Sequence, residues 1–284
     1  MTVIVPDPAR LSAAAASRLA REARARPSTE MRRVRHAPLG RCMYCLATAG
    51  AGLALTEEHL LPRALGGRLT LRDAVCEPCR RITGRLEQLT LAREFAVPKT
   101  LLALRRRRAR GKGPGRLPAV ALEGDGADAL TWSAASFPRS FSLPAFEPAG
   151  LLAGVHRGTS PRVDFVACTL NLGAPSSQAT AAAPSLPDPR AYACSIAKWA
   201  YGLAVAERGL DGCDARAMRD LLLGHRDDVF AFVGTPWPRQ PASRAWLHDM
   251  TLREHDGWLV ATLALFASAG MTPYEVVIGS LLAR

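Results

Sequence analysis

The second half of the chain carries the clearest pattern of apolar and polar positions. Residues 163–172, VDFVACTLNL, alternate as a half-buried strand does, and a Pro/Ser/Ala-rich loop follows over 172–190. In AYACSIAKWAYGLAVAERG, residues 191–209, apolar side chains recur at helical spacing and gather on one side of the predicted helix, which Gly209 is placed to end. These apolar positions are Ile196, Trp199, Ala200, Leu203, Val205 and Ala206.

The remaining C-terminal segments predict one more helix and several strands. ARAMRDLLLG, residues 215–224, is typical of a short helix closed by Gly224. VFAFVG (229–234), WLHDMTL (246–252), GWLVATLALFA (257–267) and YEVVIGSLL (274–282) predict strands, the middle two joined by a turn at 254–257. We therefore expect residues 118–284 to form an α+β domain with an apolar core, in which no motif indicates chemistry.

The first half predicts a strand, a turn, a second strand and a helix in close succession. LALTEEHLLPRALGG, residues 53–67, starts as a short strand and ends in a Gly66-Gly67 turn. RLTLRDAV (68–75) predicts the second strand, and RRITGRLEQLTLAREFA (80–96) predicts the helix. We divide the chain into an Ala/Arg-rich arm or helix (1–37), this module (38–98), a basic linker (99–117) and the C-terminal domain (118–284).

Length and apolar content limit the protein class. The chain has 284 residues and 48% hydrophobic content, which fits one or two domains. The longest apolar run, at 258–267, is shorter than the roughly 18 residues of a membrane-spanning helix, so we expect no membrane span. Arginines interrupt residues 11–28, which excludes a secretory signal; an organelle transit peptide stays open, and we favour a bacterial cytoplasmic protein.

Charge is divided unevenly along the chain. Residues 1–117 contain 24 Lys and Arg against 9 Asp and Glu, a net +15, whereas the rest has 13 against 16, a net −3. The run ALRRRRARGKGPGR at 103–116 contains no acidic residue. A one-sided excess of positive charge indicates a polyanion-binding surface, so we expect a nucleic acid as partner; a merely solvated basic surface is the alternative.

Four of the seven cysteines form two Cys-x-x-Cys pairs, Cys42 with Cys45 and Cys76 with Cys79. Two such pairs supply four thiolates for a tetrahedral zinc ion, and four protein ligands leave no open position for catalysis by that zinc. We predict structural zinc, with reduced, unligated cysteines as the alternative. The other cysteines are expected to be small buried hydrophobes; they are Cys168, Cys194 and Cys213.

The order Cys-x-x-Cys, Glu-His-Leu-Leu-Pro, Gly-Gly, Cys-x-x-Cys, helix resembles the HNH endonucleases over roughly residues 41–95. LTEEHLLPRALGGRLTL with CEPCRRITGRLEQ is similar to a bacterial branch of such proteins, and AKWAYGLAVAERG and TPYEVVIG extend the likeness weakly. The resemblance implies a zinc-stapled, treble-clef-like ββα-metal module followed by the C-terminal α+β domain.

The resemblance also implies site residues. His59 would be the general base that deprotonates water, and Glu58 would bind a catalytic Mg²⁺ or similar ion. Asp73 matches the family's middle position, where Asn is usual. Arg80 stands where the family has a final His or Asn, and because guanidinium cannot bind a cation, Thr83 and Glu87 become the candidate oxygen ligands.

Three functions follow from these observations. The first is an HNH-type endonuclease that hydrolyses phosphodiester bonds, with DNA as the favoured substrate, and the second is a zinc-dependent nucleic-acid-binding protein that does not cut. The third is a protein-interaction module in which zinc is only structural. In the first two, phosphate contacts come from Arg80, Arg81, Arg85, Arg105, Arg106, Arg107 and Arg108.

Overall fold

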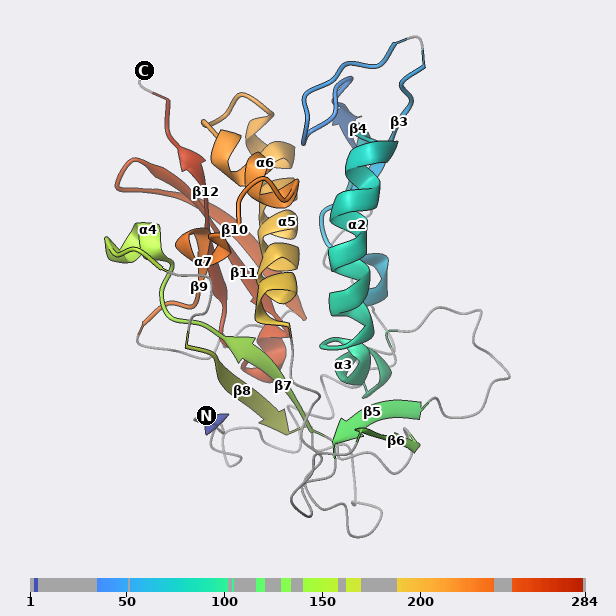
Figure 1. Cartoon of the computed structure of the whole chain (residues 1–284), viewed down its shortest axis with the longest axis vertical. Helices are drawn as coiled ribbons and strands as arrows, with labels where there is room; N and C mark the ends of the chain where they lie inside the picture. Colours follow the sequence, from blue (N-terminus) through green and yellow to red (C-terminus); the bar gives the residue numbers. More distant parts are fainter. Residues whose placement is uncertain are drawn as a thin grey trace.

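The computed structural model describes residues 35–50, 52–101, 104, 140–157, 162–169, 188–237 and 247–282, together with the backbone of strands at 3–4, 116–120 and 129–133. The chain is a mixed α+β protein, as predicted, with one long helix at its centre (Figure 1). Within the described part, no helix has the length and apolar character that crossing a bilayer requires.

The central helix, α5 (Pro189–Arg208), has clear start and stop signals. The Asp188 side chain accepts a hydrogen bond from the Ala191 N–H at 3.0 Å, and Pro189 occupies the first turn, where its missing N–H costs nothing. Gly209, with φ 76°, ends the helix as predicted. The expected single apolar face is wrong, because every residue from 191 to 205 is buried and α5 is surrounded on all sides.

On one side of α5 lies an antiparallel sheet in the order β10–β11–β12–β9 (Figure 1). Its strands are β9 (Val233–Gly234), β10 (His248–His255), β11 (Trp258–Leu265) and β12 (Tyr274–Ser280). Asp256 and Gly257, with φ 46° and 79°, form a two-residue hairpin turn, for which two positive φ values are favourable. The strands predicted from residues 246, 257 and 274 onwards are therefore confirmed.

Two short helices precede this sheet. The predicted helix at 215–224 is confirmed as α6 (Arg216–Leu222), and Gly224 has a positive φ of 81°. The strand predicted over 229–234 is wrong in its first part, which is the short helix α7 (Val229–Phe232). A short run of buried apolar residues has no periodicity that distinguishes helix from strand, and here burial against α5 is satisfied by one helical turn.

Further strands lie beyond the N-terminal end of α5. β7 (Ser140–Ala145) pairs with β8 (Asp164–Thr169), which pairs in parallel with β1 (Val3–Ile4), and the short helix α4 (Gly150–Ala153) follows β7. The strand predicted at 163–172 is confirmed for β8. β5 (Arg116–Val120) and β6 (Ala129–Ser133) form a separate hairpin. The loop predicted over 172–190 lies outside the described residues up to 187, and its last two residues instead begin α5. Most of the N-terminal arm also lies outside the described residues.

The N-terminal module has the predicted succession of strand, turn, strand and helix. β3 (Leu55–His59), the 3-10 turn η2 (Arg63–Leu65) and β4 (Thr70–Cys76) lead into α2 (Glu77–Ala92), and α3 (Ala96–Leu101) follows. β2 (Arg35–Pro38) adds to the same sheet in the order β2–β4–β3, so this sheet begins within the segment assigned to the arm.

Both glycines of the Gly66-Gly67 turn are required by geometry. Gly66 ends η2 with φ 93°, a conformation that disfavours residues with a side chain. A Cβ atom at Gly67 would lie 1.8 Å from the carbonyl oxygen of Leu61, so only glycine fits there without movement of the backbone. The turn folds the chain back tightly after the Glu-His segment and sets the register of β4 against β3.

One continuous core joins the module to the C-terminal region. α2 lies beside α5 (Figure 1), and buried residues from both regions belong to the same hydrophobic cluster. Phe95, after α2, stacks on Tyr192 of α5 with ring centroids 5.6 Å apart, and lies 5.7 Å from the Trp199 ring. The module is therefore held by packing against α5 as well as by any metal.

Candidate metal centre and buried charge cluster

The four cysteines of the two predicted pairs come together at one end of the module. Their sulfur atoms all lie within 4.8 Å of one another, and the Cys45 and Cys76 sulfurs are 3.7 Å apart. Sulfurs bound about 2.3 Å from a tetrahedral zinc ion would lie about 3.8 Å from one another. The arrangement can hold a metal ion, and the donor set fits zinc with only small side-chain movements.

Backbone contacts shape both knuckles. Cys42 and Cys45 lie on a turn in which the Leu46 N–H donates to the Cys42 carbonyl at 2.8 Å, and the Met43 N–H donates to the Ala74 carbonyl at 2.7 Å. Cys76 is the N-cap of α2, and Cys79 lies in the first helical turn. The second pair is thus positioned by the start of a helix, and the first is held against β4.

The environment of the thiols differs from one cysteine to another. Burial raises the pKa of the Cys45 and Cys79 thiols. Burial acts in the same direction on Cys42, but hydrogen bonds from backbone N–H groups, with that of Cys76 the strongest, bring its pKa below the ordinary value. Of the other cysteines, Cys194 and Cys213 are buried among apolar residues, as expected, and the Cys168 side chain lies outside the described part.

His59 lies at the end of β3, opposite Thr70 of β4, and its side chain is half-buried. Its Nδ1 is 3.2 Å from the Thr70 hydroxyl oxygen. Burial and the nearby charge of Arg63 lower the pKa of His59, so the imidazole is neutral at pH 7. If Nδ1 carries the proton and donates it to Thr70, Nε2 has the free lone pair that a general base needs.

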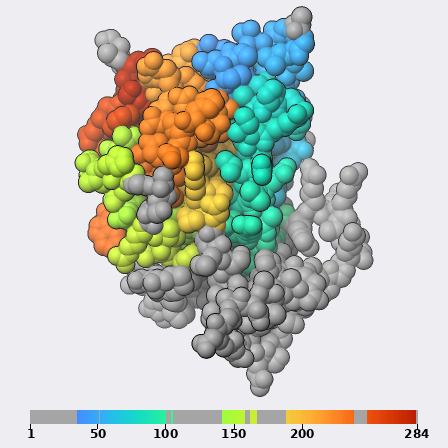
Figure 2. Space-filling model, viewed as in Figure 1, coloured from blue at the N-terminus to red at the C-terminus, as the bar shows by residue number. Residues whose placement is uncertain are grey.

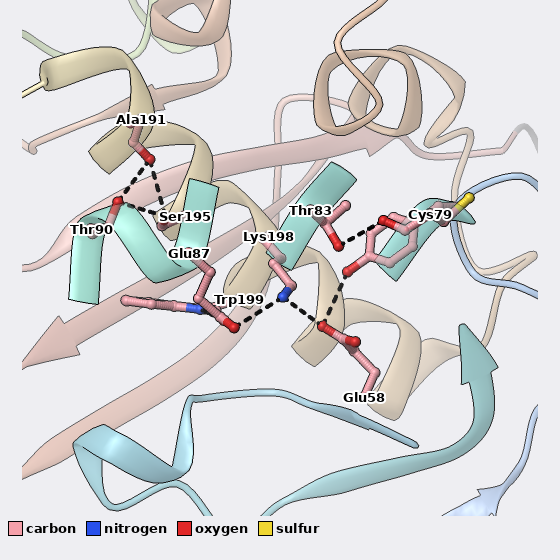
Figure 3. Close-up of polar contacts among 10 residues, drawn as sticks. Glu58, Cys79, Thr83, Glu87, Thr90, Ala191, Ser195, Lys198 and Trp199 are labelled. Carbon is pink, nitrogen blue, oxygen red and sulfur yellow. Dashed lines mark hydrogen bonds and ion pairs between the residues drawn. The ribbon is translucent and has the colours of Figure 1, made fainter. Parts of the chain in front are cut away.

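Glu58, next to His59 in the strand, points to the opposite face and is buried against α5. Its Oε1 atom is 2.8 Å from the Lys198 ammonium, and the Tyr44 hydroxyl lies 3.4 Å from the same oxygen. Lys198 also contacts Oε2 of Glu87 at 3.3 Å, while Oε1 of Glu87 accepts a 2.7 Å hydrogen bond from the Trp199 indole N–H. Figure 3 shows Lys198 between the two carboxylates.

The charges in this cluster depend on one another. Burial raises the pKa of Glu58, although the Lys198 charge opposes this effect. Burial would lower the pKa of Lys198, but Glu58 and Glu87 outweigh it and raise that pKa above its usual value. Lys198 therefore remains an ammonium ion in the interior because two carboxylates stabilise its charge.

The other candidate residues lie elsewhere. Thr83 is buried, and its hydroxyl donates to the Cys79 carbonyl at 3.1 Å. Asp73 is exposed within an irregularity of the β3–β4 pairing, where its φ is 45°. Arg80 and Arg81 are exposed and pair with Glu77, and Arg85 is exposed. Arg105, Arg106, Arg107 and Arg108 lie outside the described residues.

The structure therefore brings Glu58 and Glu87 together, with Thr83 close by on α2, but His59 faces away from Glu58. A divalent ion bound by these oxygens does not fit the arrangement, because the Lys198 ammonium lies between the two carboxylates and Thr83 is engaged with the helix backbone. We derive no catalytic step through such an ion.

Sequence reasoning did not identify Lys198, Tyr44 or Trp199 as parts of this cluster. A signal was present at Lys198, the one charged residue between positions 191 and 206, where the helix is otherwise apolar or uncharged. A charged residue in a fully buried helix needs a partner of opposite charge. The identity of that partner depends on long-range packing, which local spacing does not reveal.

Comparison with known proteins identifies no relative of the chain. No family model, no curated protein and no solved structure matches the chain.

Proposed function

We propose that the protein is a zinc-stabilised nucleic-acid-binding protein with an HNH-like module that binds without cutting. The observation that supports this proposal is that the acidic and the basic side chains of the module point in opposite directions. The carboxylates of Glu58 and Glu87 turn inward onto Lys198, whereas the arginines turn outward. An inward carboxylate neutralised by lysine is poorly placed to recruit a catalytic ion, and outward arginines suit phosphate contacts.

The outward charge is mostly positive. Over the described residues 35–50 and 52–99, the exposed acidic residues are Glu57 and Asp73, and Glu77 is partly exposed and paired with Arg80 and Arg81. Against them stand eight exposed arginines: Arg35, Arg63, Arg68, Arg72, Arg80, Arg81, Arg85 and Arg93. Arg68, Arg72 and Arg85 form no ion pair with any residue that the structure describes. Such unpaired guanidinium groups are available to neutralise a polyanion.

Helix α2 offers the best-defined part of this surface. It lies at the outside of the molecule, alongside α5 (Figure 2). Arg81 and Arg85 are one turn apart, about 6 Å along the axis, on the same exposed side. Two guanidinium groups in such a row can contact successive phosphates of one strand.

The test measures, by fluorescence anisotropy, how the affinity for a labelled DNA duplex depends on salt concentration. We expect log K to fall linearly with log salt for the wild type. Changing both Arg81→Gln and Arg85→Gln should make the slope shallower by about 2, roughly 0.9 for each lost phosphate contact. The matched control changes Arg216→Gln and Arg226→Gln, two exposed arginines of the C-terminal region, and should leave the slope unchanged.

Equal slopes for the two double variants would contradict the assignment of the surface. A wild-type protein without affinity for DNA or RNA at low salt would overturn the proposal and favour the protein-interaction module instead.

Hydrolysis at His59 is the second candidate function, and one observation favours it. The imidazole is neutral and half-buried, with Nδ1 against Thr70, which is a suitable arrangement for a general base. In that case the Glu58 carboxylate would have to leave Lys198 before it could bind a divalent ion.

A further inference from the structure

The Glu58–Glu87 cluster, defined by Tyr44, Glu58, Glu87, Lys198 and Trp199, joins three elements that are distant in sequence. Glu58 comes from β3, Glu87 from α2, and Lys198 from α5 (Figure 3). The side chains of Lys198 and Glu58 are 7% and 9% exposed, and that of Glu87 is 19% exposed. Water therefore screens these charges little, and their contacts decide which cation the cluster accepts.

Three of the four carboxylate oxygens of the cluster already have donors among the described residues. Glu58 Oε1 is contacted by the Lys198 ammonium and the Tyr44 hydroxyl. Glu87 Oε2 is contacted by the same ammonium, and its Oε1 accepts from the Trp199 indole. A hard divalent cation would need these same oxygens together with several waters, in a place that the lysine side chain fills.

We propose that Lys198 is the resident cation of this cluster: its ammonium takes the position between Glu58 and Glu87 that a divalent metal ion would otherwise occupy, and so closes the cluster to divalent metals. The lysine is tethered to a buried helix, so its effective concentration at the carboxylates far exceeds that of a free ion. Displacing it would leave an unpaired ammonium buried in the interior, which is strongly unfavourable.

A corollary concerns the protein without this ammonium. Lys198→Ala leaves two carboxylates without a counter-charge around the space that the lysine filled. That donor set, two carboxylates with room for water, is the kind that Mn²⁺ and Mg²⁺ prefer. The variant should therefore gain a divalent site that the wild type lacks, whereas Lys198→Arg keeps the charge and should not.

The experiment uses Mn²⁺ alone as the probe and the Trp199 indole N–H resonance of zinc-loaded, full-length protein as the reporter. Because the indole N–H donates to Glu87, a Mn²⁺ ion at the cluster would broaden this resonance. The resonance is assigned by its absence from the spectrum of Trp199→Phe. We expect no selective broadening in the wild type or in Lys198→Arg. In Lys198→Ala we expect selective broadening near one equivalent of Mn²⁺, with an affinity for Mn²⁺ at least about tenfold above that of the wild type. Adding Glu58→Gln to this variant should abolish the broadening.

Selective broadening in the wild type near one equivalent of Mn²⁺, abolished by Glu58→Gln, would overturn the proposal, as would a folded Lys198→Ala that gains no Mn²⁺ site. If Lys198→Ala does not fold, the wild-type titration alone decides, because it requires no variant of Lys198. The titration contains no nucleic acid, so its outcome is independent of the proposed binding function.

Discussion

At the residue scale, His248 shows how one polar side chain joins two distant parts of the chain. Its Nε2–H donates to the Leu65 carbonyl in η2 at 3.0 Å, and its Nδ1 accepts the Phe266 N–H at 3.2 Å. Only a neutral imidazole can make both contacts, because a protonated Nδ1 would face another donor. Burial lowers the pKa of His248 to about 4. The pH dependence of stability follows from this value.

We predict that acid destabilises the protein through His248. Its folded pKa of about 4 lies below the unfolded value of 6.5, so the unfolded chain takes up the proton first. Its contribution is complete above about pH 6.5 and is lost as the pH falls towards 4, by roughly 3 kcal/mol in all. His248→Gln should lower the free energy of unfolding at pH 7 and flatten its dependence on pH over this window, measured by urea denaturation. An unchanged pH slope in the variant would contradict the assignment.

At the scale of elements, local signals predicted where helices and strands lie but not what surrounds them. Gly209 ends α5 as predicted, whereas the start signals Asp188 and Pro189 lay within the predicted loop at 172–190. The apolar spacing indicated one buried face, yet α5 is buried on all sides because the module packs against the face that carries Lys198 and Tyr201. Small and polar residues on that face contact a partner element, so their hydropathy does not indicate their burial.

The contact of α5 with the first knuckle gives a prediction about metal retention. The Tyr201 hydroxyl donates to the Met43 carbonyl at 2.7 Å, between the two cysteines of that pair. Tyr201→Phe should cost about 1–3 kcal/mol of stability and speed zinc release to a chelator, because the knuckle loses an anchor.

The matched control is Tyr192→Phe, which removes a buried hydroxyl that hydrogen-bonds Tyr274 rather than the knuckle. It should cost stability while leaving the zinc release rate, followed with a chromogenic chelator, close to wild type. Equal release rates in Tyr201→Phe and the wild type would show that α5 does not hold the knuckle.

At the scale of the whole molecule, the continuous core makes the metal module and the C-terminal region one packed unit. The four cysteines were predictable, because the ligand spacing of a metal knuckle is local in the sequence. The partner of Glu58 was not, because Lys198 lies 140 positions further along the chain, and only the packing of α5 brings it there. The opposite orientation of Glu58 and His59, in contrast, follows from the alternation of neighbouring side chains along β3 and needs no long-range packing.

We predict one zinc ion per chain and a single unfolding transition that depends on it. Zinc binding by four cysteines contributes folding free energy of the same order as the stability of a whole domain. Cys76→Ser should therefore lose zinc, measured by elemental analysis, and lower the unfolding midpoint of the entire molecule. Cys213→Ser, which changes a buried cysteine outside the cluster, should keep full zinc occupancy. A folded wild-type protein without zinc would contradict this prediction.

Incubation of supercoiled plasmid with the zinc-loaded protein, in Mg²⁺ and then in Mn²⁺, tests the central claim of binding without cutting most directly. A gel-retardation lane first establishes that the plasmid is bound, and the same samples are then stripped of protein and examined for nicks. Because Lys198 neutralises Glu58 and His59 lies on the other face of the strand, we predict retarded plasmid that remains fully supercoiled with either metal. Metal-dependent nicking by the wild type, lowered by at least about a hundredfold in His59→Ala with binding unchanged, would contradict the account and establish the nuclease.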